Sequence, residues 1–292
     1  MDASRTSRRL EMGREGESRD QETRTCNITE ALVRRQASVG PHVPLDVITS
    51  LDLHLRDSRL GKIRVIEKLE KLTQLQKLNL SYNSIKTIQG LARCPLIELN
   101  LAENAISRIE HVQDIMTLQR LNLSGNRISR IPMSMSRLKN LGMLRLSRNQ
   151  LSVIEDLANL IEIRGMTNIT LEDNPMTAEV DTAVVTRAFA IHSLPSLAAV
   201  SSKAIAPHER QDAYKQFTNG SGYQALADAQ ELVAERTVSA LRRSRSGPDS
   251  MGTQERSKLL NTTISSPTRP AVDRSQTYLK SPSIVARSSG EA

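Results

Sequence analysis

Five asparagines recur at one phase of a repeated apolar pattern, each just after a short run of leucines. A side-chain amide carries two N–H donors and one acceptor oxygen, so a buried asparagine can satisfy several backbone groups where the chain turns. Chemistry of this kind is structural, and it predicts an asparagine ladder along the molecule. The ladder consists of Asn83, Asn104, Asn126, Asn149 and Asn174.

A second set of residues lies inside the leucine runs, in two series: one residue just before the second leucine of each run, and one between the second and third leucines, which are two residues apart. Side chains alternate between the two faces of a strand, so these residues point away from the leucine side. Lys77, Glu98 and Arg120 are expected side by side on neighbouring strands, about 4.8 Å apart, where opposite charges attract. A face of mixed charge predicts protein binding, and solvation alone is the alternative for part of the set. The predicted partner-binding residues are Lys77, Asn79, Glu98, Asn100, Arg120, Asn122, Met143, Arg145 and Arg148.

The residue types that catalysis or metal binding requires form no recognisable constellation. Phosphate-binding glycine loops and the G-x-S-x-G nucleophile motif are absent, and the five histidines have no cysteine or carboxylate at metal-ligand spacing. The two cysteines, Cys26 and Cys94, lie far apart, which favours a reducing compartment. We therefore expect a protein without enzyme activity, cofactor or metal.

The elements that must position both polar sets follow from the apolar residues. The pattern L-x-x-L-x-L-x-x-N-x-I-x-x-I begins at Leu75, Leu96, Leu118 and Leu141, and a degenerate copy begins at Met166. The steps between these starts are 21, 22, 23 and 25 residues, within the leucine-rich period of about 20 to 29 residues. One such unit cannot bury its apolar face alone, so neighbours must stack. The predicted fold is an α/β leucine-rich repeat solenoid, with a curved, concave parallel sheet, a helical or irregular convex side and helical caps at both ends.

Composition divides the chain into three parts. Residues 1–26 are rich in Arg, Glu and Ser and predict a disordered arm, because they cannot bury enough apolar surface to offset the entropy of ordering. Residues 27–217 form the predicted repeat domain with its caps. Residues 218–292 predict a basic tail rich in Ser and Pro that is mostly disordered, with the apolar spacing of a lone helix over 223–243.

Charge and hydropathy narrow the range of partners. The chain has a net charge of +8, which favours acidic partners such as tubulin, nucleic acid or a membrane surface, although solubility alone accounts for such a charge. Aromatic residues make up only 2% of the chain, which argues against the base-stacking platforms of nucleic-acid binders. No stretch approaches about 18 apolar residues and the N-terminus has no signal-like apolar segment. We therefore expect a cytoplasmic protein whose partners are other proteins, not membranes or nucleic acids.

The repeats resemble the short leucine-rich class that is typified by the type-1 phosphatase regulator of the cytoplasm and nucleus. The flanking stretches Asn27–Arg35, Ile66–Lys71, Leu78–Asn83 and Asp212–Phe217 are similar to the N-terminal domain of the centriolin family. That resemblance implies a cytoskeleton-associated adaptor of the centrosome, basal body or cilium that binds centrosomal or ciliary proteins on its concave face. The alternatives that the repeat class implies are a regulatory subunit of a Ser/Thr protein phosphatase and an axonemal dynein-associated light chain.

Overall fold

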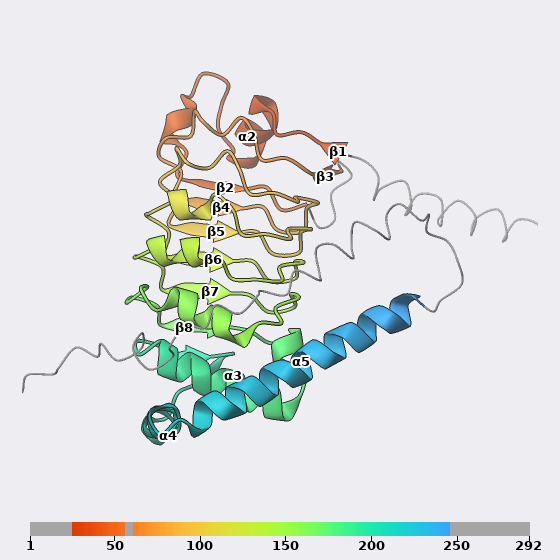
Figure 1. Cartoon of the computed structure of the whole chain (residues 1–292). Helices are drawn as coiled ribbons and strands as arrows, with labels where there is room; N and C mark the ends of the chain where they lie inside the picture. The colour runs from red at the N-terminus through yellow and green to blue at the C-terminus, as the bar shows by residue number, and fades with distance from the viewer. Residues whose placement is uncertain (1–24, 56–60, 246–292) are drawn as a thin grey trace, which may run out of the picture. The chain divides into compact units, whose positions relative to one another are not determined.

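Short strands stack one above another, and turns return the backbone from each strand to the next (Figure 1). The computed structural model describes residues 25–55 and 61–245. The strands are β1 (Thr25–Cys26), β2 (Ser50–Asp52), β3 (Lys62–Ile63), β4 (Lys77–Asn79), β5 (Glu98–Asn100), β6 (Arg120–Asn122), β7 (Met143–Arg145), β8 (Asn168–Thr170), β9 (Ala199–Val200) and β10 (Lys203–Ala204). The α-helices are α2 (Glu30–Gln36), α3 (Val180–Ser193), α4 (Pro207–Thr218) and α5 (Ser221–Arg245). The 3₁₀ helices are η1 (Leu45–Val47), η2 (Val112–Asp114), η3 (Met133–Arg137), η4 (Ile154–Leu160) and η5 (Pro175–Thr177).

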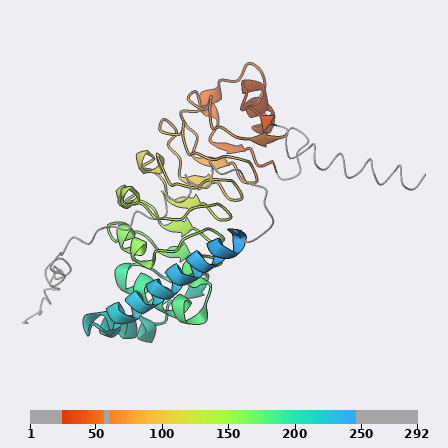
Figure 2. The ribbon, with the colours of Figure 1, turned by 45° about the vertical axis from the view of Figure 1, so that its right-hand side comes forward.

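One sheet of eight strands runs through the stack in the order β10-β9-β8-β7-β6-β5-β4-β2. Neighbours from β2 to β9 are parallel, and only β10 pairs antiparallel, with β9. Leucines of the same phase face each other: Leu99 on β5 pairs with Leu78 on β4 and with Leu121 on β6. Because a slip of one residue would turn every leucine to the opposite face, burial of the leucines fixes this register. The predicted solenoid of parallel strands is therefore confirmed, and Figure 2 shows it from a second side.

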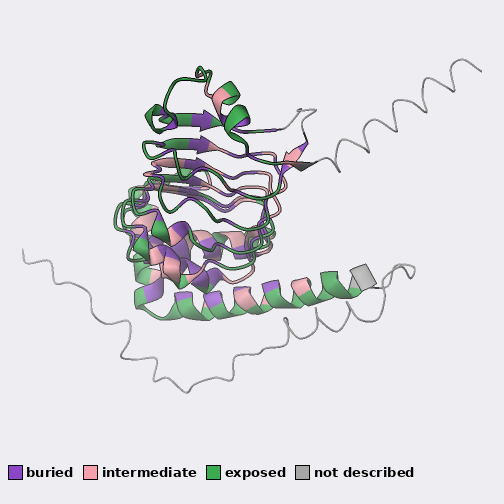
Figure 3. Cartoon of the chain, turned by 90° about the horizontal axis from the view of Figure 1, so that it is seen from above, coloured by how far each residue is buried: buried purple, intermediate pink, exposed green. Residues whose placement is uncertain are grey.

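The core is a continuous column of leucine and isoleucine between the strands and the returning turns. Leu101 and Leu123, which follow strands β5 and β6, have no exposed surface, and neither have Ile106 and Ile128 on the returning side. Figure 3 shows the buried positions lining the inside of the stack. Each such side chain stabilises the fold by roughly 1.5–3 kcal/mol relative to an exposed position. Near-identical layers therefore build the core of the repeats from leucine and isoleucine, and the two buried phenylalanines, Phe189 and Phe217, lie beyond the last repeat.

The buried asparagines join each repeat to the preceding one. Nδ2 of Asn126 donates to the carbonyl of Leu123 in its own turn (3.0 Å) and to that of Leu101 one repeat earlier (2.9 Å). Its Oδ1 accepts a bond from the N–H of Ile106 (3.0 Å), which also belongs to the earlier repeat. The other four asparagines repeat this pattern. These bonds satisfy turn groups that have no partner in the sheet.

Helix α2 closes the N-terminal end of the column. Thr29 caps it, because its Oγ1 accepts a hydrogen bond from the N–H of Leu32 at 3.1 Å. Strand β1 pairs in parallel with β3, so Thr25–Cys26, which we expected in a disordered arm, instead form a strand. The partner of this strand lies far along the chain, which local composition cannot reveal. The rest of the predicted arm, residues 1–24, lies outside the described residues.

Helices α3 and α4 cover the C-terminal layer, as the sequence predicted. The Phe217 ring on α4 lies between two residues of α3, with ring centroids 5.5 Å from Phe189 and 4.8 Å from His192. Arg187 on α3 binds both carboxylate oxygens of Glu209 on α4, at 2.9 and 3.1 Å. An aromatic cluster and one bidentate ion pair thus hold α3 and α4 together.

Helix α5, which follows the predicted domain boundary at residue 217, packs against the residues that precede it. The sequence predicted a lone helix within a tail, but α5 packs on the repeat domain through Leu226, Ala229 and Val233, which are buried. Figure 3 shows that the buried residues of α5 lie along one side of the helix. Spacings of three and four residues place these three on one helical face, which supplies the physical reason for the docking.

A glutamine fixes the docked helix by two backbone contacts. Gln230 donates from Nε2 to the carbonyl of Ser152 (2.7 Å) and accepts from the N–H of Ile154 (2.8 Å). The side-chain amide therefore satisfies both groups of an irregular stretch that follows β7. The remainder of the predicted tail, residues 246–292, lies outside the described residues.

Three properties of the described residues bear on the class of protein. Over 25–55 and 61–245, no helix combines the length and apolarity needed to cross a membrane. Within the same ranges, His, Cys, Asp and Glu side chains form no group able to hold a metal ion. Cys26 and Cys94 are free thiols, and burial raises the pKa of the Cys94 thiol.

Replacement of Asn126 by alanine should cost roughly 2–4 kcal/mol in the free energy of unfolding, because buried backbone groups of two repeats lose their partners. Urea denaturation measures this loss. The matched control is Asn140→Ala, which removes one bond from an exposed asparagine to Met116 and should cost less than about 1 kcal/mol. Equal losses for the two variants would contradict a structural role for the ladder.

The C-terminal cap should lose stability in acid through Glu209. Hydrogen bonds from Arg187, and a further one from the backbone N–H of Ala206, lower the pKa of Glu209 to about 2. A lowered folded-state pKa stabilises the fold above the ordinary carboxyl value of about 4.3, and this stability is lost as the pH falls toward 2. Glu209→Gln should therefore flatten the fall in unfolding free energy between about pH 5 and about pH 3. Glu110→Gln, at an exposed residue between β5 and η2, is the control and should retain the wild-type slope.

Candidate protein-binding surface

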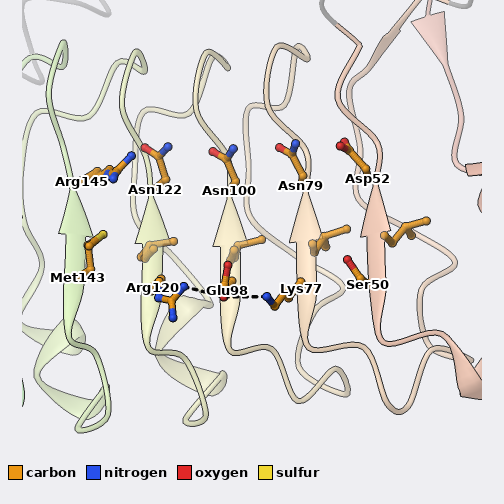
Figure 4. Close-up of a pocket in the computed structure, with 14 residues that line it drawn as sticks. Ser50, Asp52, Lys77, Asn79, Glu98, Asn100, Arg120, Asn122, Met143 and Arg145 are labelled. Atoms are coloured by element: carbon orange, nitrogen blue, oxygen red, sulfur yellow. Dashed lines mark hydrogen bonds and ion pairs between the residues drawn. The ribbon is translucent and has the colours of Figure 1, made fainter. Parts of the chain in front are cut away.

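The outward sides of β2 and β4–β7 form one surface, here called the strand face. Figure 4 shows that its side chains lie in two rows across the strands. The first row is Ser50, Lys77, Glu98, Arg120 and Met143, and the second row is Asp52, Asn79, Asn100, Asn122 and Arg145. An open hollow of about 540 Å³ lies over them, and all of the residues that line it come from these five strands. Sheet register alone therefore assembles the surface from five separate stretches of sequence.

The first row contains two ion pairs across neighbouring strands, and both share Glu98. Oε1 of Glu98 lies 3.3 Å from Nζ of Lys77 on one side and 2.8 Å from Nη1 of Arg120 on the other. These are the cross-strand pairs that the alternating charges predicted. Because both cations are more than half exposed, the pairs contribute little to stability, and the two cations are available to a partner. Met143 ends the row with a half-buried apolar side chain.

The second row begins with a carboxylate and ends with a guanidinium. Asp52 lies on β2 and its Oδ1 is 2.8 Å from Nδ1 of His54. Burial acts to raise the pKa of Asp52, but hydrogen bonds from the backbone N–H and ring of His54 outweigh it, and the pKa is lowered. Arg145, at the other end on β7, is exposed. The row is thus polar and changes from acidic to basic along the stack.

Eight of the nine predicted partner-binding residues line the hollow together. Arg148 does not: it lies in the turn after β7 with a φ of 55° and forms an ion pair with Glu103. Ser50 and Asp52 also line the hollow, although they were not among the predicted binding residues. The sequence could have indicated both residues, because they occupy the same repeat positions as Lys77 and Asn79 on the next strand.

Comparison with known proteins finds a family model and several relatives that match part of this chain. Residues 95–230 match the family model of a leucine-rich repeat. The chain is 27% identical over 162 residues to the probable U2 small nuclear ribonucleoprotein A' of Caenorhabditis elegans, covering 54% of this chain and 62% of that protein. It is 29% identical over 121 residues to the protein phosphatase 1 regulatory inhibitor subunit PPP1R7 homolog of Arabidopsis thaliana, covering 40% of this chain and 36% of that protein. Both relatives therefore extend beyond the part that this chain matches.

Among solved structures, the Drosophila melanogaster SNF/U2A' complex contains a chain similar to this one. The match has a TM-score of 0.44 and 24% sequence identity, and it covers 69% of this chain and 98% of that chain. An internalin from Listeria monocytogenes, InlJ, matches with a TM-score of 0.40 and 21% identity over 56% of this chain and 33% of that chain.

Proposed function

We propose that this chain is a non-enzymatic leucine-rich repeat module that binds a protein partner across its strand face. One observation carries the proposal: the hollow is lined by two registered rows of charged, amide and apolar side chains from five strands. An open surface of this size and composition suits the polar rim and apolar anchor of a protein interface. Parallel pairing of the strands places these side chains in register.

The composition of the face favours a protein over a nucleic acid. Glu98 places a carboxylate between Lys77 and Arg120, where it would repel a phosphate backbone. No aromatic side chain lines the hollow, so bases would have no ring on which to stack. The residues that line the hollow also show no paired acid, base and nucleophile of an enzyme site, and Lys77, Glu98 and Arg120 are instead paired with one another.

Different observations favour different partners. The Arabidopsis relative supports a role as a regulatory subunit of a Ser/Thr protein phosphatase. The Caenorhabditis relative supports a role in a ribonucleoprotein particle through a protein component. The stretches that flank the repeats support a centrosomal or ciliary adaptor, and the repeat class leaves an axonemal dynein-associated light chain as a further alternative. All of these use the same face.

A photo-crosslinking amino acid at Met143 tests the proposal in the full chain. Benzoylphenylalanine at this position lies in the hollow and should capture partner proteins in cells, whereas the same group at the exposed Met133 on η3 should not. Arg120→Glu should reduce capture at position 143 by about tenfold, which corresponds to about 1.4 kcal/mol.

Mass spectrometry of the captured proteins then separates the roles. Capture of a phosphatase catalytic subunit would support the role as a phosphatase regulator. Capture of a ribonucleoprotein component would support a role in a ribonucleoprotein particle. Capture of a centrosomal, ciliary or dynein protein would support the adaptor or light-chain role. Capture at position 133 but not at position 143 would contradict binding on the strand face altogether.

A further inference from the structure

The second row of the strand face contains side-chain amides whose orientation the backbone fixes. Oδ1 of Asn100 accepts a hydrogen bond from the N–H of Ala102 at 3.2 Å, and Oδ1 of Asn122 accepts one from the N–H of Ser124 at 3.1 Å. Each amide oxygen is therefore used within its own turn. Because only the oxygen can accept these bonds, the amide nitrogen of each side chain must be directed away from the turn.

These amide nitrogens are unused donors on an accessible surface. Over residues 25–55 and 61–245, no hydrogen bond from Nδ2 of Asn100 or Asn122 is formed, and both side chains line the hollow. Asn79 differs, because its Oδ1 also accepts from the hydroxyl of Ser81 (2.8 Å) and it interacts with the carboxylate of Asp52. The free donors thus begin at β5.

Arg145 continues the row on β7 and has no ion-pair partner among the described residues. The other two arginines near the face already form ion pairs within the chain: Arg120 with Glu98, and Arg148 with Glu103. Register places Arg145 directly beside Asn122. Asn100, Asn122 and Arg145 therefore form what we call the donor row: three side chains on neighbouring strands, about 4.8 Å apart, whose unpaired polar groups are N–H donors.

We infer that the donor row binds an acidic segment of the protein partner, with a carboxylate on Arg145 and further acceptor oxygens on Asn122 and Asn100. The inference rests on the proposed function and names the chemistry of the partner. Charge complementarity carries it: both acids that line the hollow, Asp52 and Glu98, already have partners, so the unengaged charge is positive. A guanidinium also fits a planar carboxylate with two parallel bonds.

The substitution Asn100→Asp removes the outward amide donor without removing the hydrogen bond that the side chain makes within its turn. The new side chain keeps an oxygen for the N–H of Ala102 and replaces only the outward donor with an acceptor. Binding of a fluorescein-labelled peptide of ten glutamates to the full chain, measured by fluorescence anisotropy, should weaken by about tenfold or more, because a charge-assisted contact is lost and repulsion is added. Arg145→Gln should have a similar effect. The thermal midpoint of both variants should match that of the wild type.

Gln89→Glu is the matched control, because it makes the same change in net charge at an exposed residue outside the face. Its affinity for the glutamate peptide should equal that of the wild type. Equal weakening by Gln89→Glu and Asn100→Asp would overturn the inference, since bulk charge would then explain binding. So would a wild-type chain that does not bind the peptide, or that binds a ten-nucleotide oligothymidylate more tightly.

Crosslinking at position 143 separates this inference from the proposed function. Undiminished capture of proteins by the Asn100→Asp and Arg145→Gln variants would remove the donor row and leave the strand face as the binding surface. Absence of capture at position 143 in the wild type would instead remove the proposed function.

Discussion

The bridge that each buried asparagine makes between two successive repeats is the interaction on which the rest of the structure depends. Nδ2 of Asn104 reaches the carbonyl of Leu80 in the repeat before it, and its Oδ1 receives the N–H of Ile85 from that same repeat. The turns would otherwise contain buried, unpaired backbone groups, which cost about 1–3 kcal/mol each. Leucine burial brings the layers together in register, and the asparagines make this stacking possible because they satisfy the buried turn groups of adjacent repeats.

A fixed phase has a consequence on the outside of the sheet. Residues that occupy the same position in successive repeats must stand side by side on parallel strands, whether or not they interact. Glu98 thereby meets both Lys77 and Arg120, although these residues are separated by 21 and 22 positions in the sequence. The buried core and the two rows of the strand face therefore follow from one periodicity.

That periodicity explains how much could be predicted from the sequence. The strands, the ladder and the two rows follow from alternation on a strand and from a repeat of nearly constant length. The docking of α5 does not, because Gln230 bonds to Ser152 and Ile154, 78 and 76 residues away, and no repeated pattern marks such a contact. The sequence also could not show which arginines form ion pairs. Arg145 and Arg148 are three residues apart, yet of these two only Arg148 forms an ion pair among the described residues.

Trapping the register chemically tests the stacking of the layers most directly. In a chain with Cys26→Ser and Cys94→Ala, the pair Glu98→Cys and Arg120→Cys lies in register on β5 and β6, about 4.8 Å apart, within the range of a disulfide. The pair Asn100→Cys and Arg120→Cys is offset by two residues, roughly 8 Å, which is beyond that range. Mild oxidation followed by mass spectrometry should find a disulfide in the first pair and not in the second. Equal disulfide formation in both pairs would show that the strands do not hold this register.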